Sequence, residues 1–155
     1  MTVLQGRLAD RDSWSPVGHC PIEKTMGLLG TKSAMLIMRE AYYGTTRFDD
    51  FCQRVGITKA AAAARLAELV DIGLLDRRPY REPGQRTRDE YVLTDAGTDF
   101  MPVVWALFEW GRNHIDDPGL RLAHAGCGAE ATVAIRCVGG HDVPADELVV
   151  RVSDG

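Results

Sequence analysis

Two short stretches near the C-terminus carry residue types that bind metal ions. The first reads His124-Ala-Gly-Cys127 and the second reads Cys137-Val-Gly-Gly-His141. Cysteine thiolates and histidine imidazoles are common ligands of structural zinc, which is almost always four-coordinate and tetrahedral. The sequence therefore allows one zinc site built from His124, Cys127, Cys137 and His141. The alternative is that this segment is held by packing alone, without a metal.

A second group of chemically competent residues is a set of arginines: Arg77, Arg78, Arg81, Arg86 and Arg88. They surround a Pro-Gly pair at residues 83 and 84, which marks a turn between two apolar-rich stretches, 74–81 and 88–93. A flexible cationic hairpin tip suits the phosphate backbone of duplex DNA, where such contacts supply affinity rather than sequence information. Acidic residues stand among the arginines, so the alternative is an ordinary solvated surface.

Cys20 is a candidate for redox sensing. It precedes Pro21, where a helix is expected to begin, and a helix N-terminus favours the reactive thiolate form of cysteine. The alternative is a half-buried small residue whose oxidation has no consequence. Cys52 lies on the apolar side of another expected helix, beside Phe48 and Phe51, and we interpret it as part of the core.

The arginines and the central helices belong to one continuous pattern between residues 44 and 94. A short helix at 47–55 is followed by a turn at Gly56, and Thr58 is the expected N-cap of a long helix that Gly73 ends. The hairpin comes next. Helix, tight turn, helix and basic hairpin is the order of a winged helix-turn-helix, whose second helix lies in the major groove of DNA. The predicted fold class is mainly α with a β-hairpin wing (α+β).

Helices are also expected on both sides of this pattern. Apolar spacing predicts a helix from Pro21 that Gly30 stops, and a second helix that Thr31 or Ser33 can cap and that ends at Gly44. Thr94 is the expected cap of a long helix that reaches Ile115. Pro102 falls near the first turns of that last helix, where a fray or kink is possible.

The ends of the chain differ from this body. Residues 1–19 are polar and contain the turn-forming residues Ser13, Ser15, Pro16 and Gly18. We interpret them as an N-terminal arm without its own core. Residues 20–115 form the predicted winged helix-turn-helix and dimerisation domain. Residues 120–155 are rich in Gly, Ala and Val, with apolar runs at 131–138 and 148–152, and they predict a small C-terminal β-module.

Composition restricts the class of protein. Of the 155 residues, 45% are apolar and 26% are charged, a balance typical of globular chains. The net charge of −4 argues mildly against nucleic-acid binding, but the distribution of charge over the surface matters more than its sum. No apolar run is long enough to span a membrane and no secretory signal is seen, so the expected location is cytoplasmic. The sequence shows no Gly-rich phosphate loop, no helical His-x-x-x-His pair and no nucleophile–base arrangement. An enzyme is therefore not predicted. Asp49-Asp50 and Asp116-Asp117 are interpreted as surface charge and loop caps.

Several motifs, taken in order, resemble a known family. They are Cys20-Pro, Leu29-Gly-Thr-Lys32, Arg47-Phe-Asp-Asp-Phe51, Ile57-Thr58, Arg65-Leu-Ala-Glu-Leu69, Gly73-Leu-Leu, Arg78-Pro-Tyr80, Glu90-Tyr-Val-Leu-Thr-Asp-Ala-Gly97 and Trp110. Together they are similar to the HxlR-type transcriptional regulators, winged helix-turn-helix proteins related to the MarR type. The likeness covers roughly residues 20 to 112.

The resemblance implies a homodimer that binds double-stranded DNA. In this family the N-terminal and C-terminal helices pair across a two-fold axis and each wing flanks the duplex. The residues at the positions implied to approach DNA are Arg47, Thr58, Lys59, Arg65, Arg77, Arg78, Arg86 and Arg88. For Arg65 the alternative is a structural role. In several members a cysteine at the place of Cys20 senses oxidants or electrophiles. Some members also carry a tail that resembles a zinc ribbon, but here Gly140 replaces its last cysteine, with His141 next to it.

The sequence departs from the family pattern at two places that bear on recognition. Ser33 stands where a tryptophan is usual, and the recognition helix carries alanines at 60, 63 and 64. Ala63 can contact a thymine methyl group but cannot hydrogen-bond a base. Direct readout is therefore expected to be sparse, with more reliance on the wing and on DNA shape.

Two other functions stay open at this point. One is a sensor of a small molecule or an oxidant, with a site near Trp105, Phe108 and Trp110 or in the tail. The other is a protein-interaction module that uses the winged fold with weak DNA binding or none.

Overall fold

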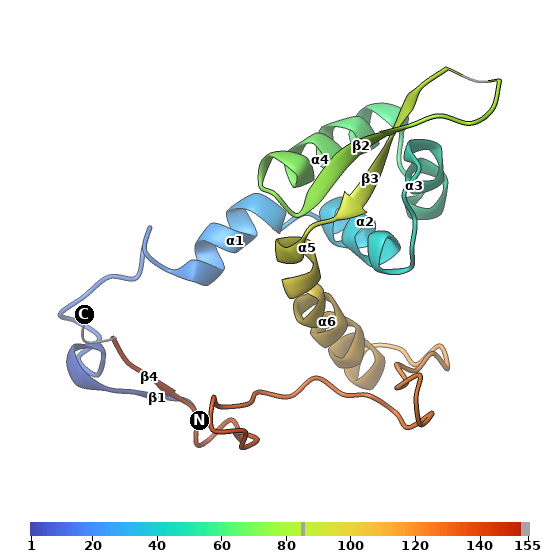
Figure 1. The fold of residues 1–155 in the computed structure, drawn as a ribbon. Helices are drawn as coiled ribbons and strands as arrows, with labels where there is room; N and C mark the ends of the chain where they lie inside the picture. The colour runs from blue at the N-terminus through green and yellow to red at the C-terminus, as the bar shows by residue number, and fades with distance from the viewer. Residues whose placement is uncertain (85, 153–155) are drawn as a thin grey trace. The chain divides into compact units, whose positions relative to one another are not determined.

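The computed structural model describes residues 1–84 and 86–152 and divides into two compact units. One unit is the continuous segment Pro21–Asp117. The other joins Met1–Cys20 to Pro118–Gly155. Figure 1 labels the elements of both.

The unit Pro21–Asp117 contains the helices and one hairpin. Its elements are α1 (Pro21–Leu29), α2 (Lys32–Tyr42), α3 (Phe48–Val55), α4 (Lys59–Asp71), β2 (Leu75–Tyr80), β3 (Arg88–Leu93), α5 (Asp95–Asp99) and α6 (Met101–His114). The predicted fold class, a winged helix-turn-helix of mainly helical character, is confirmed.

Three threonines set where helices begin. The side-chain oxygens of Thr31, Thr58 and Thr94 accept hydrogen bonds from backbone amides three residues later, at 3.2, 3.2 and 3.0 Å. Each satisfies an amide that the first turn of a helix leaves without a partner. The predicted caps Thr58 and Thr94 are confirmed, and of the two candidates Thr31 and Ser33 the structure uses Thr31.

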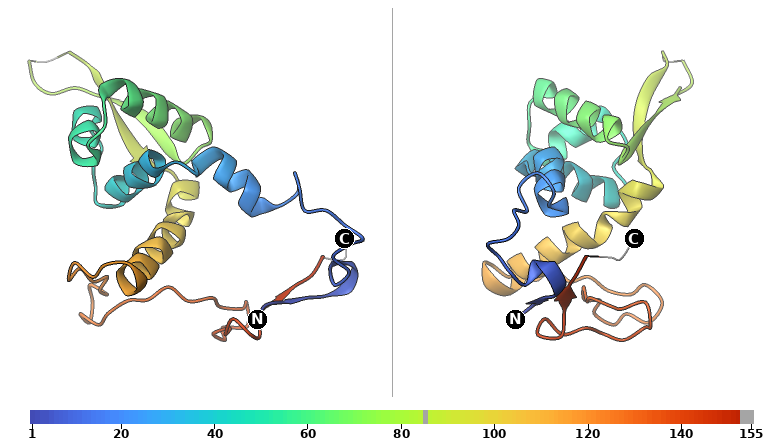
Figure 2. Two further views of the ribbon diagram at one scale, coloured as in Figure 1. Left: turned by 180° about the vertical axis from the view of Figure 1, so that it is seen from behind. Right: turned by 90° about the vertical axis from the view of Figure 1, so that its left-hand side faces the viewer.

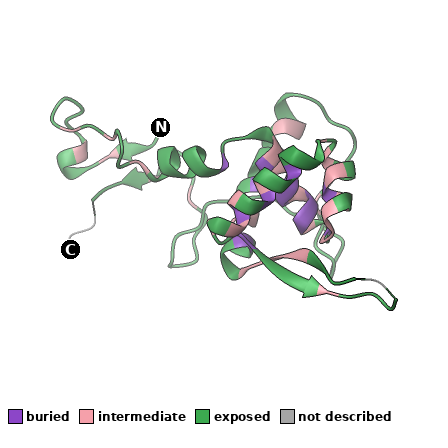
Figure 3. Ribbon diagram, turned by 90° about the horizontal axis from the view of Figure 1, so that it is seen from above, coloured by how far each residue is buried: buried purple, intermediate pink, exposed green. Residues whose placement is uncertain are grey.

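The core lies where α2, α3, α4 and the base of the hairpin meet. Its fully buried large side chains are Ile37, Met38, Phe51, Leu66, Leu69 and Leu75. Figure 3 shows buried positions, in purple, gathered mainly in the helices beside the hairpin. Phe51 packs edge-on against Tyr91 of β3 with ring centroids 6.3 Å apart, so the core fixes α3 against the wing.

The wing is an antiparallel ladder from Leu75 opposite Leu93 to Tyr80 opposite Arg88. Its tip, residues 81–87 apart from residue 85, extends beyond the helices in both views of Figure 2. The strands lie within one residue of the stretches that the sequence predicts.

The last predicted helix is divided. Instead of one helix from Thr94, the structure has α5 and α6 with Phe100 between them. Pro102 has no amide hydrogen, so it cannot continue the hydrogen-bond ladder of α5, but it fits the first turn of a new helix.

The terminal unit departs from the predicted domains. Residues 1–19 are not a separate arm, because β1 (Val3–Leu4) pairs in parallel with β4 (Val149–Val150), and a short 3-10 helix covers Gly6–Leu8. Within the described part of residues 120–155, the only other pairings are single bridges, Ala123 with Glu130 and Arg136 with Asp142.

The apolar run at 131–138 forms no named strand. Val133, Ile135 and Val138 are exposed, so in this unit they have no apolar layer on which a strand could pack. The predicted β-module is therefore mostly turns and bridges in its described part.

Candidate nucleic-acid interface

α3 and α4 form the helix-turn-helix, and the turn between them is fixed by local hydrogen bonds. Gly56 ends α3 in a left-handed conformation with φ of 71°, which residues with a Cβ rarely adopt. The carbonyl of Cys52 accepts hydrogen bonds from the amides of Gly56 and Ile57, at 3.0 and 3.2 Å. Thr58 then caps α4, so its free first-turn amides and positive dipole end lie at a defined place.

α4 has one buried side and one exposed side. Ala62, Leu66 and Leu69 are buried in the core. The exposed positions in its first two turns are Lys59, Ala60, Ala61, Ala63 and Ala64. This exposed side consists almost wholly of methyl groups. It can approach another surface closely, but only Lys59 brings a hydrogen-bond donor.

Lys59 is already paired within the chain. Its ammonium lies 2.8 Å from the carboxylate of Asp49, in the first turn of α3. This hydrogen bond and the charge of Lys59 hold the pKa of the Asp49 carboxyl below its ordinary value, and Arg88 lowers it further. The same hydrogen bond and the charge of Asp49 raise the pKa of the Lys59 ammonium. The start of α4 therefore carries an ion pair rather than an unopposed positive charge.

Arg47 joins the helix-turn-helix to the wing. Its backbone bridges to Glu90 of β3, and its guanidinium carbon lies 3.1 Å from the centroid of the Tyr80 ring. Nη1 lies 3.4 Å from the Glu90 carboxylate, but it is enclosed and makes no hydrogen bond to the residues that the structure describes. The residue that the family resemblance places ahead of α3 as a DNA contact is therefore half-buried, in packing contact with the wing.

Arg65 is also engaged inside the protein. It forms an ion pair with Glu68 one turn along α4, and its side chain is 28% exposed. A helix position three residues from its partner is the usual geometry for such a pair. Arg65, one of the predicted phosphate contacts, thus already has Glu68 as an ion-pair partner in the unbound protein.

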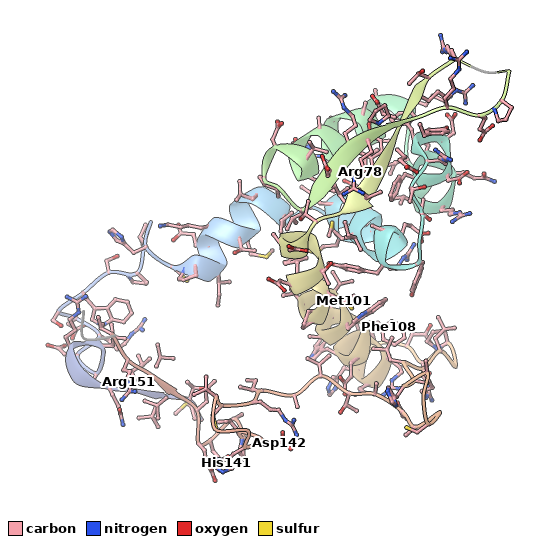
Figure 4. The ribbon with its side chains drawn as sticks, in the orientation of Figure 1. Arg78, Met101, Phe108, His141, Asp142 and Arg151 are labelled. Carbon is pink, nitrogen blue, oxygen red and sulfur yellow. The ribbon has the colours of Figure 1, made fainter. Side chains whose placement is uncertain are left out.

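The wing arginines are more exposed. Arg77 lies 3.6 Å from Asp89 across the ladder, and Arg78 lies 3.4 Å from Asp76 on its own strand. Figure 4 labels Arg78 on β2. Arg86 and Arg88 are exposed near the tip.

A groove of about 570 Å³ lies between α3, the start of α4 and the wing. We call it the wing groove. It is lined by Arg47, Phe48, Asp49, Asp50, Lys59, Tyr80, Glu82, Arg86, Arg88, Asp89 and Tyr91. The structure thus brings Arg47, Lys59, Arg86 and Arg88 to one groove. Arg77 and Arg78 lie elsewhere on the wing, and Arg65 lies farther along α4.

Two residues that shape this groove are not singled out by the sequence pattern. Asp49 appears there as ordinary surface charge, and Tyr80 as the end of a strand. A signal for Asp49 does exist, since it opens one helix and Lys59 opens the next across a tight turn. For Tyr80 no local signal exists, because its partner Arg47 lies more than thirty residues earlier in the sequence.

Ser33 lines a second, smaller hollow. It has a volume of about 290 Å³ and lies where α2 begins beside the turn of the helix-turn-helix. The lining residues are Lys32, Ser33, Leu36, Val55, Gly56 and Ile57. The tryptophan that the resemblance leads one to expect at Ser33 would be large enough to fill part of it.

The two cysteines of the body differ in setting. Cys20 is half-buried and directly precedes α1, as the sequence predicts. Cys52 is half-buried too, and burial raises the pKa of its thiol, an effect that the charge of Asp49 strengthens. Because the thiolate is the reactive form, Cys52 is set up as an unreactive residue.

The predicted zinc ligands form two separate pairs. Nδ1 of His124 lies 3.1 Å from Sγ of Cys127, and Sγ of Cys137 lies 3.6 Å from Nδ1 of His141. In the described residues no three His, Cys, Asp or Glu side chains gather as a metal site would require. The four ligands are therefore not brought together at one centre. Each pair is confined to its own tight loop.

Apolar side chains remain exposed on the two helices expected to pair between subunits. On α1 they are Ile22, Met26 and Leu28, and on or just after α6 they are Val103, Leu107, Trp110 and Ile115. Trp105 instead packs on Tyr42 and Tyr43, with ring centroids 5.8 and 5.7 Å apart. Among the described helices none has the length and apolarity needed to cross a membrane.

Comparison with known proteins gives a consistent result. A family model described as HxlR-like helix-turn-helix matches residues 28–118. The HTH-type transcriptional regulator Rv3095 of Mycobacterium tuberculosis is 34% identical over 119 residues, which cover 75% of this chain and 74% of that protein.

Solved structures agree with these sequence matches. PA1607, described as a candidate transcription factor, has a TM-score of 0.74 at 30% identity, covering 90% of this chain and 98% of its own. The redox regulator HypR in its reduced form has a TM-score of 0.56 at 29% identity, covering 62% of this chain and 94% of its own.

Proposed function

Because the chain belongs to the HxlR-type helix-turn-helix family, we propose that it regulates transcription by binding duplex DNA as a homodimer. The observation that carries the proposal is the wing groove. It combines the free N-terminus of a recognition helix with the cationic tip of a hairpin, the two elements by which a winged helix-turn-helix approaches a duplex.

The two elements have different tasks in this proposal. The exposed alanines of α4 let the helix backbone come close to the floor of the major groove, and Ala63 can contact a thymine methyl group. Arg86 and Arg88 bind phosphates, assisted by Arg77 and Arg78. With few base-reading side chains, specificity comes largely from the spacing of two half-sites and from DNA shape.

Dimerisation supplies that spacing. The exposed apolar residues of α1 and α6 suit a subunit interface, because apolar surface of this kind is unfavourable in water and a second copy offers the same surface in return. A two-fold dimer presents its recognition helices to major grooves about one helical turn, roughly 34 Å, apart.

Selection of bound sequences from a pool of random duplexes tests the proposal directly. The expected result is an inverted repeat with half-sites one helical turn apart, whose binding weakens steeply as salt rises. No enrichment, or binding that salt does not change, would favour a protein-interaction module instead. A repeat spacing unrelated to the helical turn would contradict the dimer but not DNA binding.

Cys20 supports a second element of the proposal, regulation by oxidation. It lies half-buried at the start of α1, in a helix that carries the proposed dimer contacts, and HypR, a structurally similar protein, is a redox regulator. The test compares release of DNA by an oxidant in the wild type and in Cys20→Ser. Release only in the wild type is expected, and equal release in both would exclude Cys20 as the sensor. Cys52→Ser is the matched control.

A further inference from the structure

The hollow beside Ser33 has the size of a small-molecule site. Its volume is about 290 Å³, and all of its lining residues lie in the unit Pro21–Asp117. Pockets that hold small molecules usually measure about 300–1,000 Å³. The hollow is therefore at the lower end of this range and suits a ligand of one or two fused rings.

Three half-buried aliphatic side chains form the walls of this hollow. They are Leu36 on α2, Val55 at the end of α3 and Ile57 in the turn that follows. Val55 and Ile57 also pack against the core, so the walls are continuous with the packed interior of the unit. Because burial of apolar surface is favourable in water, these walls favour a ligand with an apolar body.

Hydrogen bonds hold the walls in position. Thr31 caps the first turn of α2 by accepting a hydrogen bond from the amide of Ala34 at 3.2 Å. On the other side, the amides of Gly56 and Ile57 donate to the carbonyl of Cys52. The hollow is therefore already formed in the free protein, and a ligand does not have to order it.

The charge in this hollow is positive. Lys32 supplies an ammonium group and Ser33 a hydroxyl, and no acidic side chain of the described residues lines it. The wing groove differs, because four carboxylates stand there among four cations. Lys32 also has no ion-pair partner within the described part of the chain, whereas Lys59 pairs with Asp49 at 2.8 Å. Charge complementarity therefore selects an anionic ligand.

The hollow is open to solvent at Lys32 and Gly56, which are both exposed. A ligand there is buried on one side, so the binding energy available is small and the entropy lost on binding matters. A rigid ring loses less conformational freedom than a flexible chain of the same size. An aromatic carboxylate combines a rigid apolar body with a single negative charge.

We propose that this hollow binds a small aromatic carboxylate. The ring packs against Leu36, Val55 and Ile57, and the carboxylate pairs with the ammonium of Lys32 and accepts a hydrogen bond from Ser33. The ligand contacts the turn that sets the start of α4, so the site is placed to act on the helix-turn-helix. Binding of the ligand does not depend on DNA, and the test uses the free protein, so its outcome is separate from that of the DNA-binding proposal.

The test follows the amide signals of the isotopically labelled full chain by nuclear magnetic resonance while naphthoate is added. Saturable shifts are expected at Ser33, Gly56 and Ile57, with a Kd of about 1 mM or tighter, as is usual for a ligand of this size. Neutral naphthamide should bind about two- to fivefold more weakly, because it lacks the charge that Lys32 attracts. Acetate and inorganic phosphate, which have no apolar body, should leave these signals unchanged at the same concentrations.

Two variants locate the ligand. Ser33→Trp places a large ring in the hollow and should abolish saturable naphthoate binding. Lys32→Gln should remove the preference for naphthoate over naphthamide, and Lys24→Gln on α1, which makes the same change in charge, should keep it. Circular dichroism checks that the helices are intact. Since Lys32 is exposed, Lys32→Gln tests the proposal even if Ser33→Trp does not fold.

Several results would overturn the proposal. Without saturable shifts up to about 10 mM naphthoate, the hollow is not a site for this class of ligand. Equal affinity for naphthoate and naphthamide would contradict the role of Lys32, and undiminished binding in a folded Ser33→Trp would place the ligand elsewhere. Equal shifts with acetate or phosphate would mean a general anion site that does not recognise the aromatic ring.

Discussion

The ammonium of Lys59 lies 2.8 Å from the carboxylate of Asp49, and this ion pair joins the first turns of the two helices of the helix-turn-helix. Asp49 places a negative charge beside the proposed DNA surface and partly neutralises the only cation at the start of α4. Both groups also line the wing groove, where DNA phosphates would approach.

Asp49→Asn should therefore strengthen DNA binding. Removing the carboxylate leaves Lys59 unopposed and removes repulsion of phosphate. We expect binding about two- to fivefold tighter at fixed salt and a salt dependence steeper by about one released counterion. Fluorescence anisotropy across a salt series measures both quantities. The control is Asp71→Asn at the other end of α4, which changes the charge equally; the same gain in that variant would contradict a local effect.

The wing arginines should supply affinity. Replacing Arg86 and Arg88 together by Ala removes two proposed phosphate contacts, so binding at fixed salt should weaken by about tenfold or more and the logarithmic salt slope should fall by about 1.8. A double variant of Arg7 and Arg151, which lie in the terminal unit, makes the same change in net charge. Equal weakening in the two double variants would mean that net charge rather than wing contact determines affinity.

Arg47 should act through the wing rather than through DNA alone. Its guanidinium stacks on Tyr80, and a planar stacked arginine is not replaced by lysine. Both Arg47→Lys and Arg47→Ala should lower the free energy of unfolding by about 1–2 kcal/mol. Denaturant unfolding measures the loss. Arg47→Lys in a Tyr80→Leu background should add little, because the stacking is already lost; additive losses would show that the two side chains act independently.

The sequence predicts the helical body well because its signals are local. Thr31, Thr58 and Thr94 mark helix starts, and Gly56 marks the turn. The contacts that define the wing groove depend on tertiary structure. Arg47 meets Tyr80 and Glu90 only after the hairpin folds back on α3, so its type and position predict a cation at the surface but not its packing role.

In the C-terminal segment, the sequence pattern predicts a strand over 131–138 that the described residues do not form. Its apolar runs predict strands, yet a strand needs a layer to pack against, and Val133 and Val138 find none within the terminal unit. The spacing of His and Cys places two side chains together within each loop of four or five residues, but in the described residues it does not bring the four predicted ligands to one centre.

The exposed apolar side of α6 should hold the dimer together. Leu107→Glu and Trp110→Glu place a charge on side chains that are 54% and 58% exposed in one chain. If a second copy buries them, the unpaired charge opposes association, so a shift to monomer is expected in sedimentation, with weaker binding to a two-half-site duplex. Val17→Glu, at an exposed apolar position in the terminal unit, is the control. Unchanged dimers in both α6 variants would exclude this helix from the interface.

Tyr42 should make stability depend on pH at the alkaline end. Its hydroxyl donates a hydrogen bond of 2.7 Å to the carbonyl of Gly97, tying α2 to α5, and burial raises the pKa of Tyr42 to about 12. In the unfolded chain the same group loses its proton near its ordinary value of 10.0. The stabilisation is therefore fully present below pH 10 and is lost as the pH rises from there through 12.

Tyr42→Phe should lower stability by about 0.5–1.5 kcal/mol near neutral pH, since the Gly97 carbonyl loses its side-chain donor. It should also flatten the decline of stability above pH 10. Part of that decline should persist, because burial raises the pKa of Tyr91 as well. The neighbouring Tyr43 is exposed, so Tyr43→Phe is the matched control and should leave both quantities unchanged. Denaturant midpoints measured from pH 8 to 12 test this prediction. Identical pH profiles for wild type and Tyr42→Phe would show that Tyr42 does not cause the alkaline loss of stability.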